Sequence, residues 1–182
     1  EKKEEGISHF IEHMMFKGTK NLTALDIAEK FDSMGTHVDA FTGKEYTCVY
    51  VKMIDTYLSS VLELVSDIIL NSEFKLEEVK KEKGVILEEI KMYLDSPTEY
   101  VIDIFIDSLF NGHPLGHPII GSNSTVEKIG REEILNYRKK FFHPNNTIIS
   151  LAGNLKSTEV FSLTEKYFGE GKWEKKWMDF KI

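Results

Sequence analysis

The sequence contains a single cysteine, Cys48, in 182 residues. One cysteine cannot form an internal disulfide, which excludes the small disulfide-stabilised folds and favours a reducing compartment. Only 4 prolines and 12 glycines are present, so the composition also excludes a collagen-like or linker-like chain. No stretch approaches the eighteen or so consecutive apolar residues that a membrane-spanning helix requires, and we therefore expect no membrane insertion.

Positive charge is also in short supply. The chain has 23 Lys and Arg against 30 Asp and Glu, which gives a net charge of −7. Binding to nucleic acid is therefore not expected, because affinity for phosphates comes from clustered Lys and Arg. Hydrophobic residues make up 41% and charged residues 29%, which is ordinary globular usage for one sizeable domain or two small ones.

Apolar periodicity predicts more helices than strands, which indicates the α+β class. A near capping box of Thr23 and Asp26 marks one helix start. A hairpin is expected at Gly43–Lys44. Helices are predicted at 6–16, 23–35, 56–70, 76–94, 98–110, 131–141 and 157–168, strands at 37–42, 46–53 and 147–152, and a turn-rich stretch at 111–124.

Residues 9–13 read His-Phe-Ile-Glu-His. On a helix, His9 and His13 lie one turn apart on the same face, so both imidazoles can reach one cation. Glu12 lies near that face and could take a proton from a metal-bound water. This inverted His-x-x-Glu-His arrangement is typical of zinc hydrolases, in which a third protein ligand completes the site and one position stays open. The alternative is an amphipathic helix whose histidines are exposed or hydrogen-bonded in the core.

The third ligand is not determined by spacing. The predicted helix at 76–94 is packed around Ile86 and Leu87, and Gly84 favours close approach of another element there. A turn-rich loop is expected around Pro114 and Gly116 rather than a helix. The residues left open as ligands are Cys48, His37, His113, His117, Glu78, Glu82 and Glu89, whereas His143 is interpreted as a loop residue.

The segment from Gly6 to Thr19, GISHFIEHMMFKGT, resembles the signature of the pitrilysin/insulinase metallopeptidases. The resemblance is greatest to the N-terminal half of the mitochondrial processing peptidase branch and its bacterial relatives. It continues through Asp39–Thr42, His113–Gly121, Phe142–Asn146 and Ala152–Asn154, in the order of the family. Asp39 departs from the pattern, because the family usually has Asn at this position.

The resemblance implies a complete site. In the family, a downstream glutamate is the third zinc ligand, and here this residue is Glu89, which would bind Zn²⁺ together with His9 and His13. Glu12 would be the general base and Glu82 a supporting residue behind the ligands. An extended peptide substrate would be added as a strand along Ala40, Phe41 and Thr42.

The resemblance also implies an architecture and a function. We expect an α+β fold with a mostly antiparallel sheet and helices packed on one face, in which residues 1–182 form a single peptidase domain. Family members also have one or two earlier strands and a second, substrate-closing half, and we expect neither within residues 1–182. The expected activity is zinc-dependent hydrolysis of extended or unstructured peptides, in the manner of a processing protease. A homodimer or a pair with a related chain is expected, in the bacterial cytoplasm rather than a mitochondrial matrix.

Two other functions fit parts of the pattern. The family includes non-catalytic subunits that serve in binding or assembly, although their His-x-x-Glu-His run is typically degraded and here it is intact. S-ribosylhomocysteine lyases also use an inverted His motif, with a cysteine as the third ligand. In that case Cys48 would be required for metal binding.

Overall fold

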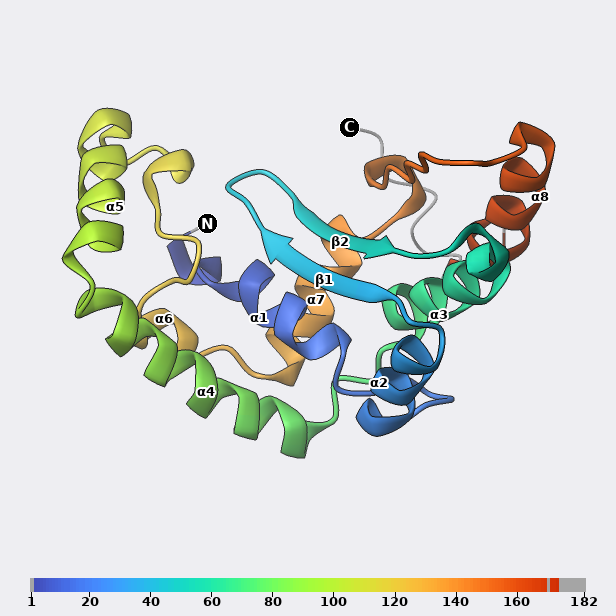
Figure 1. Cartoon of the computed structure of the whole chain (residues 1–182). Helices are drawn as coiled ribbons and strands as arrows, with labels where there is room; N and C mark the ends of the chain where they lie inside the picture. Colours follow the sequence, from blue (N-terminus) through green and yellow to red (C-terminus); the bar gives the residue numbers. More distant parts are fainter. Residues whose placement is uncertain (1, 170, 174–182) are drawn as a thin grey trace. The chain divides into compact units, whose positions relative to one another are not determined.

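A computed structural model describes residues 2–169 and 171–173 of the chain. It confirms the α+β class, with a two-stranded antiparallel sheet among many helices (Figure 1). The α-helices are α1 (Ile7–Met15), α2 (Ala24–Ser33), α3 (Leu58–Asn71), α4 (Leu76–Leu94), α5 (Pro97–Phe110), α6 (Asn123–Val126), α7 (Arg131–Phe141) and α8 (Ser157–Phe168). The strands are β1 (His37–Thr42) and β2 (Thr47–Lys52), and short 3-10 helices lie at Lys2–Glu4, Asp55–Tyr57, Pro114–Gly116 and Pro144–Asn146.

The chain folds into two compact units, each built from three separate segments. The first unit contains Glu1–Met14, Ala40–Val49 and Phe74–Leu135. The second unit contains Met15–Asp39, Tyr50–Glu73 and Asn136–Ile182. All the residues of the expected metal site belong to the first unit.

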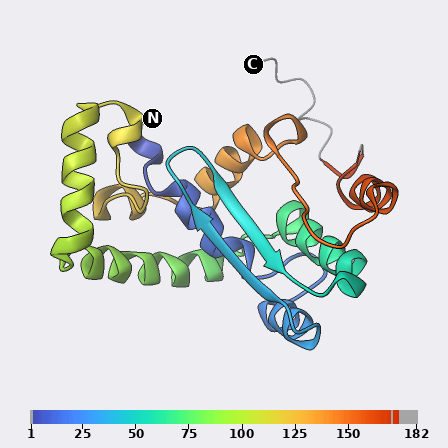
Figure 2. The same ribbon diagram turned by 45° about the horizontal axis from the view of Figure 1, so that its top comes forward.

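The two strands form the predicted hairpin, which Figure 2 shows as a long pair of ribbons. The turn closes where the amide of Gly43 donates to the carbonyl of Tyr46, at 2.7 Å. Side chains of β1 alternate between exposed and half-buried, as expected for a strand with one face covered. This alternation assigns Ala40 and Thr42 to the covered face and Phe41 to the exposed face.

In the second unit, α2 begins at the capping box predicted from Thr23 and Asp26, with both reciprocal hydrogen bonds present. The predicted strand at 147–152 is wrong, because this segment forms no strand in the described part of the chain. Ile149 and Leu151 instead pack against the apolar cluster of Leu58, Leu62 and Phe168, while the side chain of Ile148 is 94% exposed. The apolar pattern therefore reports burial of alternate side chains, but a strand also needs a hydrogen-bonded neighbour.

In the first unit, two glycines permit a close backbone contact next to the start of α1. A side chain at Gly121 would place its Cβ 2.8 Å from the carbonyl oxygen of Glu5, and one at Gly6 would approach the carbonyl oxygen of Ile120 to 2.7 Å. Both glycines have positive φ, of 88° and 79° for Gly6 and Gly121, which L-residues rarely adopt. The prediction that Gly84 marks a close approach is wrong, because a Cβ there would have no neighbour within 4 Å.

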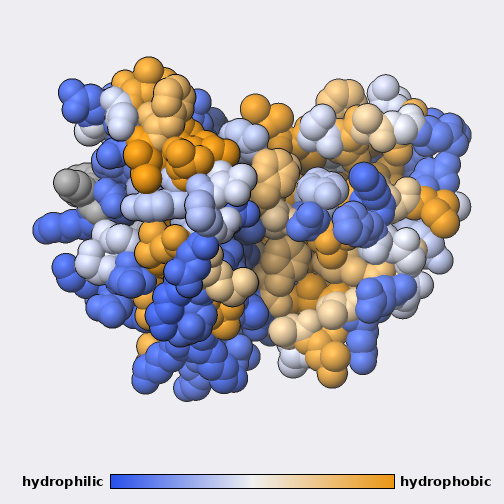
Figure 3. Space-filling view, turned by 60° about the vertical axis from the view of Figure 1, so that its left-hand side comes forward, coloured by the Kyte–Doolittle hydropathy of each residue, from blue (hydrophilic) through white to orange (hydrophobic). Residues whose placement is uncertain are grey.

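Helix α5 of the first unit is unusual because none of its residues is buried. Val101, Phe105 and Leu109, spaced four residues apart, lie along one stripe and are each more than half exposed. Apolar side chains gather over this helix at the upper left of the space-filling view (Figure 3). A helix of such apolar composition is normally covered, whereas the side chains of α5 are exposed or half-buried.

No helix in the described residues has both the length and the apolar character needed to cross a membrane.

Candidate metal centre

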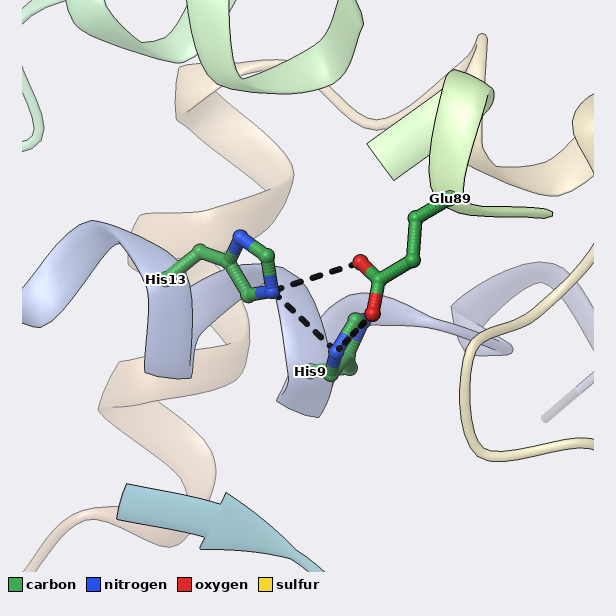
Figure 4. Close-up of side chains that lie close together, drawn as sticks. All are labelled: His9, His13 and Glu89. Carbon is green, nitrogen blue, oxygen red and sulfur yellow. Dashed lines mark hydrogen bonds and ion pairs between the residues drawn. The ribbon is translucent and has the colours of Figure 1, made fainter. Parts of the chain in front are cut away.

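Helix α1 places two imidazoles side by side. Its buried face carries Phe10, Ile11 and Met14, each at most 1% exposed, so the helix is anchored by apolar side chains on that face. His9 and His13 lie on another face, one turn apart, with their Nε2 atoms 3.2 Å from each other (Figure 4). The rings meet edge to face, with centroids 4.5 Å apart.

A carboxylate from α4 meets both rings. Glu89 Oε2 lies 3.6 Å from Nε2 of His13, and Glu89 Oε1 lies 3.9 Å from Nε2 of His9. In a tetrahedral zinc site with bonds of about 2.0–2.2 Å, neighbouring ligand atoms are roughly 3.3–3.6 Å apart. The separations among His9, His13 and Glu89 are close to this range, so one small cation fits between the three side chains.

The chemistry of the donor atoms also suits a cation. Glu89 Oε2 is buried and accepts no hydrogen bond, although the whole side chain is 43% exposed. A buried carboxylate oxygen without a donor is costly, and a bound cation would satisfy it. Two imidazole nitrogens and one carboxylate oxygen are a ligand set that zinc accepts, with a fourth position left for water.

Glu82 lies behind the second histidine. Its Oε1 is 2.9 Å from Nδ1 of His13, and the residue is only 6% exposed. A carboxylate at this position accepts a hydrogen bond from Nδ1–H, which leaves the lone pair of Nε2 directed at Glu89 and His9. This hydrogen bond favours the ring orientation and tautomer that a metal ligand needs.

Burial lowers the pKa of His9 to about 4, and the neighbouring His13 contributes a smaller part of this shift. The His9 ring is therefore neutral near pH 7 and has a lone pair to offer without displacing a proton.

The metal-free protein is expected to lose stability on acidification because of His9. Its ring is protonated below about pH 6.5 when the chain is unfolded but only below about 4 when folded, so the unfolded state binds the extra proton between these values. The free energy of unfolding should therefore fall by about 3 kcal/mol between pH 6.5 and pH 4 because of this one group. Urea unfolding of the full-length protein in chelator, at several pH values, measures the effect.

The H9Q variant should show a flatter pH dependence over this range, whereas H37Q, at an exposed position, should follow the wild type. Equal slopes for the wild type and H9Q would contradict the assignment.

Glu12 lies in the same pocket as His9 and Glu89, a hollow of about 330 Å³. One carboxylate oxygen of Glu12, Oε2, accepts a hydrogen bond from the hydroxyl of Thr42 at the end of β1. The expected substrate strand borders this pocket. The pocket is lined by His9, Glu12, Ala40, Phe41, Thr42, Glu89, Tyr93, Asp103, Ile119 and Ile120.

Four of these lining residues are absent from the site residues predicted from the sequence, although two of them lie in the segment 113–121 of the family resemblance. Tyr93 follows Glu89 by one helical turn, a spacing that could have identified it. Burial and a hydrogen bond with Asp103 raise the pKa of Tyr93 to about 12, so its phenol stays protonated near neutral pH. Asp103, Ile119 and Ile120 come from α5 and the following loop, and no local pattern connects them with the motif.

The other candidate ligands do not join the group. Among the described residues, His9, His13 and Glu89 are the His, Cys, Asp or Glu side chains close enough together to hold one ion. His113 instead caps the 3-10 turn at Pro114–Gly116, in the loop expected there, and His117 pairs with Glu5 at 3.1 Å. The remaining candidates are Cys48, a free thiol in β2, His37, which contacts the ring of Tyr50, and Glu78, which pairs with Lys81.

The chain belongs to the insulinase family, peptidase family M16, whose model matches residues 1–123. The model of the M16 inactive domain matches residues 128–181. All of the residues that meet at the candidate metal centre fall in the first match. The sequence-based resemblance is thus confirmed at the level of the family.

Among its relatives, the chain is 42% identical to the uncharacterized zinc protease YmxG of Bacillus subtilis, covering 90% of this chain and 40% of that protein. It is 37% identical to an uncharacterized zinc protease of Mycobacterium leprae, covering 90% and 37% of the two chains. The chain therefore spans about two fifths of the length of these curated relatives.

Two solved structures share the fold. A protease from Helicobacter pylori superposes with a TM-score of 0.91 at 27% identity, covering 99% of this chain and 42% of that one. The periplasmic protease PqqL from Escherichia coli gives a TM-score of 0.82 at 27% identity, and the match covers 93% of this chain and 20% of the PqqL chain. These likenesses agree with the α+β assignment.

Proposed function

We propose that the chain carries the metal centre of a zinc-dependent metalloendopeptidase that hydrolyses extended or unstructured peptides, in the manner of a processing protease. The observation that carries the proposal is the meeting of His9, His13 and Glu89, two of which, His9 and Glu89, line one pocket with Glu12. Membership of the M16 family and the zinc protease names of relatives support both the hydrolase class and the metal.

The residues divide the chemistry between them. His9, His13 and Glu89 would hold Zn²⁺, which as a Lewis acid makes water more acidic and polarises a carbonyl. Glu12 would accept the proton of the attacking water and then give it to the leaving amine as the peptide bond breaks. Glu82 would keep the ring of His13 in the required orientation.

The substrate would lie along Ala40, Phe41 and Thr42. These residues line the pocket next to Glu12, and β1 stands at an edge of its two-stranded sheet. Binding through backbone hydrogen bonds places few demands on side chains, so many extended peptides would fit and compact folded proteins would not.

We further propose that residues 1–182 act as a single peptidase domain. Neither compact unit is a continuous segment, because the chain passes between them after Met14, Asp39, Val49, Glu73 and Leu135. The two-fifths coverage of relatives supports pairing with a second half, a related chain or a second copy. A bacterial cytoplasmic location is supported by the bacterial relatives and the single thiol, Cys48.

An assay of the full-length protein on an unstructured fluorogenic peptide, with and without a chelator, tests this function. We expect turnover that the chelator removes and that added Zn²⁺ restores. A non-catalytic subunit would bind zinc or peptide without turnover, and that result would reject the proposal. Substitution of Cys48 by Ser should leave zinc content unchanged, which separates this site from a lyase-type centre with a cysteine ligand.

Removal of the carboxylate behind His13 should weaken the metal site without abolishing it. The E82A variant of the full-length protein is expected to bind zinc about 10–100-fold more weakly, because the ring loses the partner that fixes its tautomer. E82Q keeps a carbonyl acceptor and should lose less. Competition with a chromophoric chelator measures the affinity, and E77A, an exposed position on the same helix, is the control. Wild-type affinity in E82A would contradict the supporting role.

A further inference from the structure

The turn between β1 and β2 is held from two sides. The hydroxyl of Thr42, at the end of β1, donates a hydrogen bond to Glu12 Oε2 on α1. Two residues later, Lys44 donates from Nζ to the carbonyl oxygen of His117 at 2.6 Å and lies 3.6 Å from Asp103 Oδ1. One short segment thus contacts α1, α5 and the loop after α5, all within the first unit.

These contacts matter because Glu12 is a long side chain. A glutamate has three rotatable bonds, and ordering them for proton transfer costs conformational entropy. A fixed hydroxyl donor at one carboxylate oxygen removes much of this freedom before the substrate arrives and leaves the other oxygen to accept a proton. Preorganisation of this kind is a recurrent source of catalytic rate, and a displacement of 1 Å can cost about 100-fold.

Lys44 gives the donor a fixed position. Its side chain is only 23% exposed, and so is held against the unit rather than extended into water. The ammonium group has a neutral acceptor in the carbonyl of His117 and an anionic partner in Asp103. A turn anchored at Lys44 cannot move away without breaking the charge-assisted hydrogen bond to the loop after α5 and separating the ion pair with Asp103 on α5.

We propose that Thr42 is a positioning residue for Glu12, and that Lys44 holds the turn that keeps Thr42 in place. The inference rests on the proposed peptidase function and adds a coupling between substrate alignment and the position of the general base. The strand that would align the substrate ends in the residue that orients the general base. Peptide register and base position are therefore set by the same stretch of backbone.

The T42V variant of the full-length protein tests this inference, because valine has nearly the shape of threonine and favours a strand but lacks the hydroxyl. We expect kcat to fall by about 10–100-fold, with KM and zinc content unchanged, whereas T42S should restore most of kcat. T47V, the same substitution on β2 of the same hairpin, is the matched control and should behave as wild type. K44M should lower kcat several-fold, and K44R should recover part of the loss.

The possible outcomes separate the positioning role of Thr42 from the peptidase function. An active wild type with an equally active, zinc-loaded T42V would overturn the positioning role and leave the peptidase function standing. The positioning role also fails if T42S is as impaired as T42V, or if T42V loses its zinc, since Thr42 would then be a packing residue. A wild type without chelator-sensitive turnover would remove the proposed function and this inference together.

Discussion

The E12Q variant of the full-length protein is expected to retain its zinc and to lose about 10²–10⁴-fold in kcat. Glutamine has the size of glutamate and can still accept the hydrogen bond of Thr42, but its amide cannot take a proton from water. Glu12 is not among the three side chains that meet around the cation position, so the metal affinity should not depend on its charge.

Steady-state kinetics on an unstructured peptide, together with elemental analysis after dialysis, measures both properties. E29Q, at an exposed position on α2, is the control and should match the wild type in both. An E12Q protein with full zinc and undiminished turnover would exclude Glu12 as the base. A protein that lost its zinc would instead assign Glu12 to metal binding.

The second large effect concerns the carboxylate ligand. The E89A variant should lose zinc on dialysis, with an affinity loss greater than the roughly 10–100-fold expected for Glu82, which contacts the far nitrogen of His13. Two histidines would remain, and these are one ligand short of the three that catalytic zinc sites use. Turnover should fall with the zinc content and recover only in part when excess Zn²⁺ is added.

The neighbouring residue provides a matched control. Glu88 is 69% exposed and pairs with Lys91 on the surface of α4, so E88A removes one carboxylate from the same helix without touching the site. Zinc content should then equal that of the wild type. If E89A and E88A bound zinc equally well, the third ligand would have to be sought elsewhere.

Local patterns in the sequence predict the elements that local interactions define. The capping box of Thr23 and Asp26 and the hairpin at Gly43–Lys44 depend on neighbours a few residues away, and the structure contains both. The helical interval of His9 and His13 likewise follows from the geometry of a single helix. These features need no knowledge of the rest of the fold.

Features that depend on contacts between distant segments cannot be predicted from the spacing of residues along the sequence. Glu82 and Glu89 lie on one helix and both approach the histidines, but Glu82 meets Nδ1 of His13 and Glu89 meets Nε2. Which glutamate faces which nitrogen depends on how α4 passes α1, a long-range arrangement that only the family resemblance suggests. The strand expected at 147–152 fails for the same reason, since strand pairing is not encoded within the strand itself.

The contact between Gly6 and Gly121 sets a rule for substitution across distant homologues and for design. Because each Cβ would collide with the backbone of the opposite segment, a larger residue at one position is tolerable only if the other segment is rebuilt. Both positions should therefore remain glycine wherever this contact is kept. A transplant of the His-x-x-Glu-His helix into another scaffold would have to bring the 120–121 segment with it.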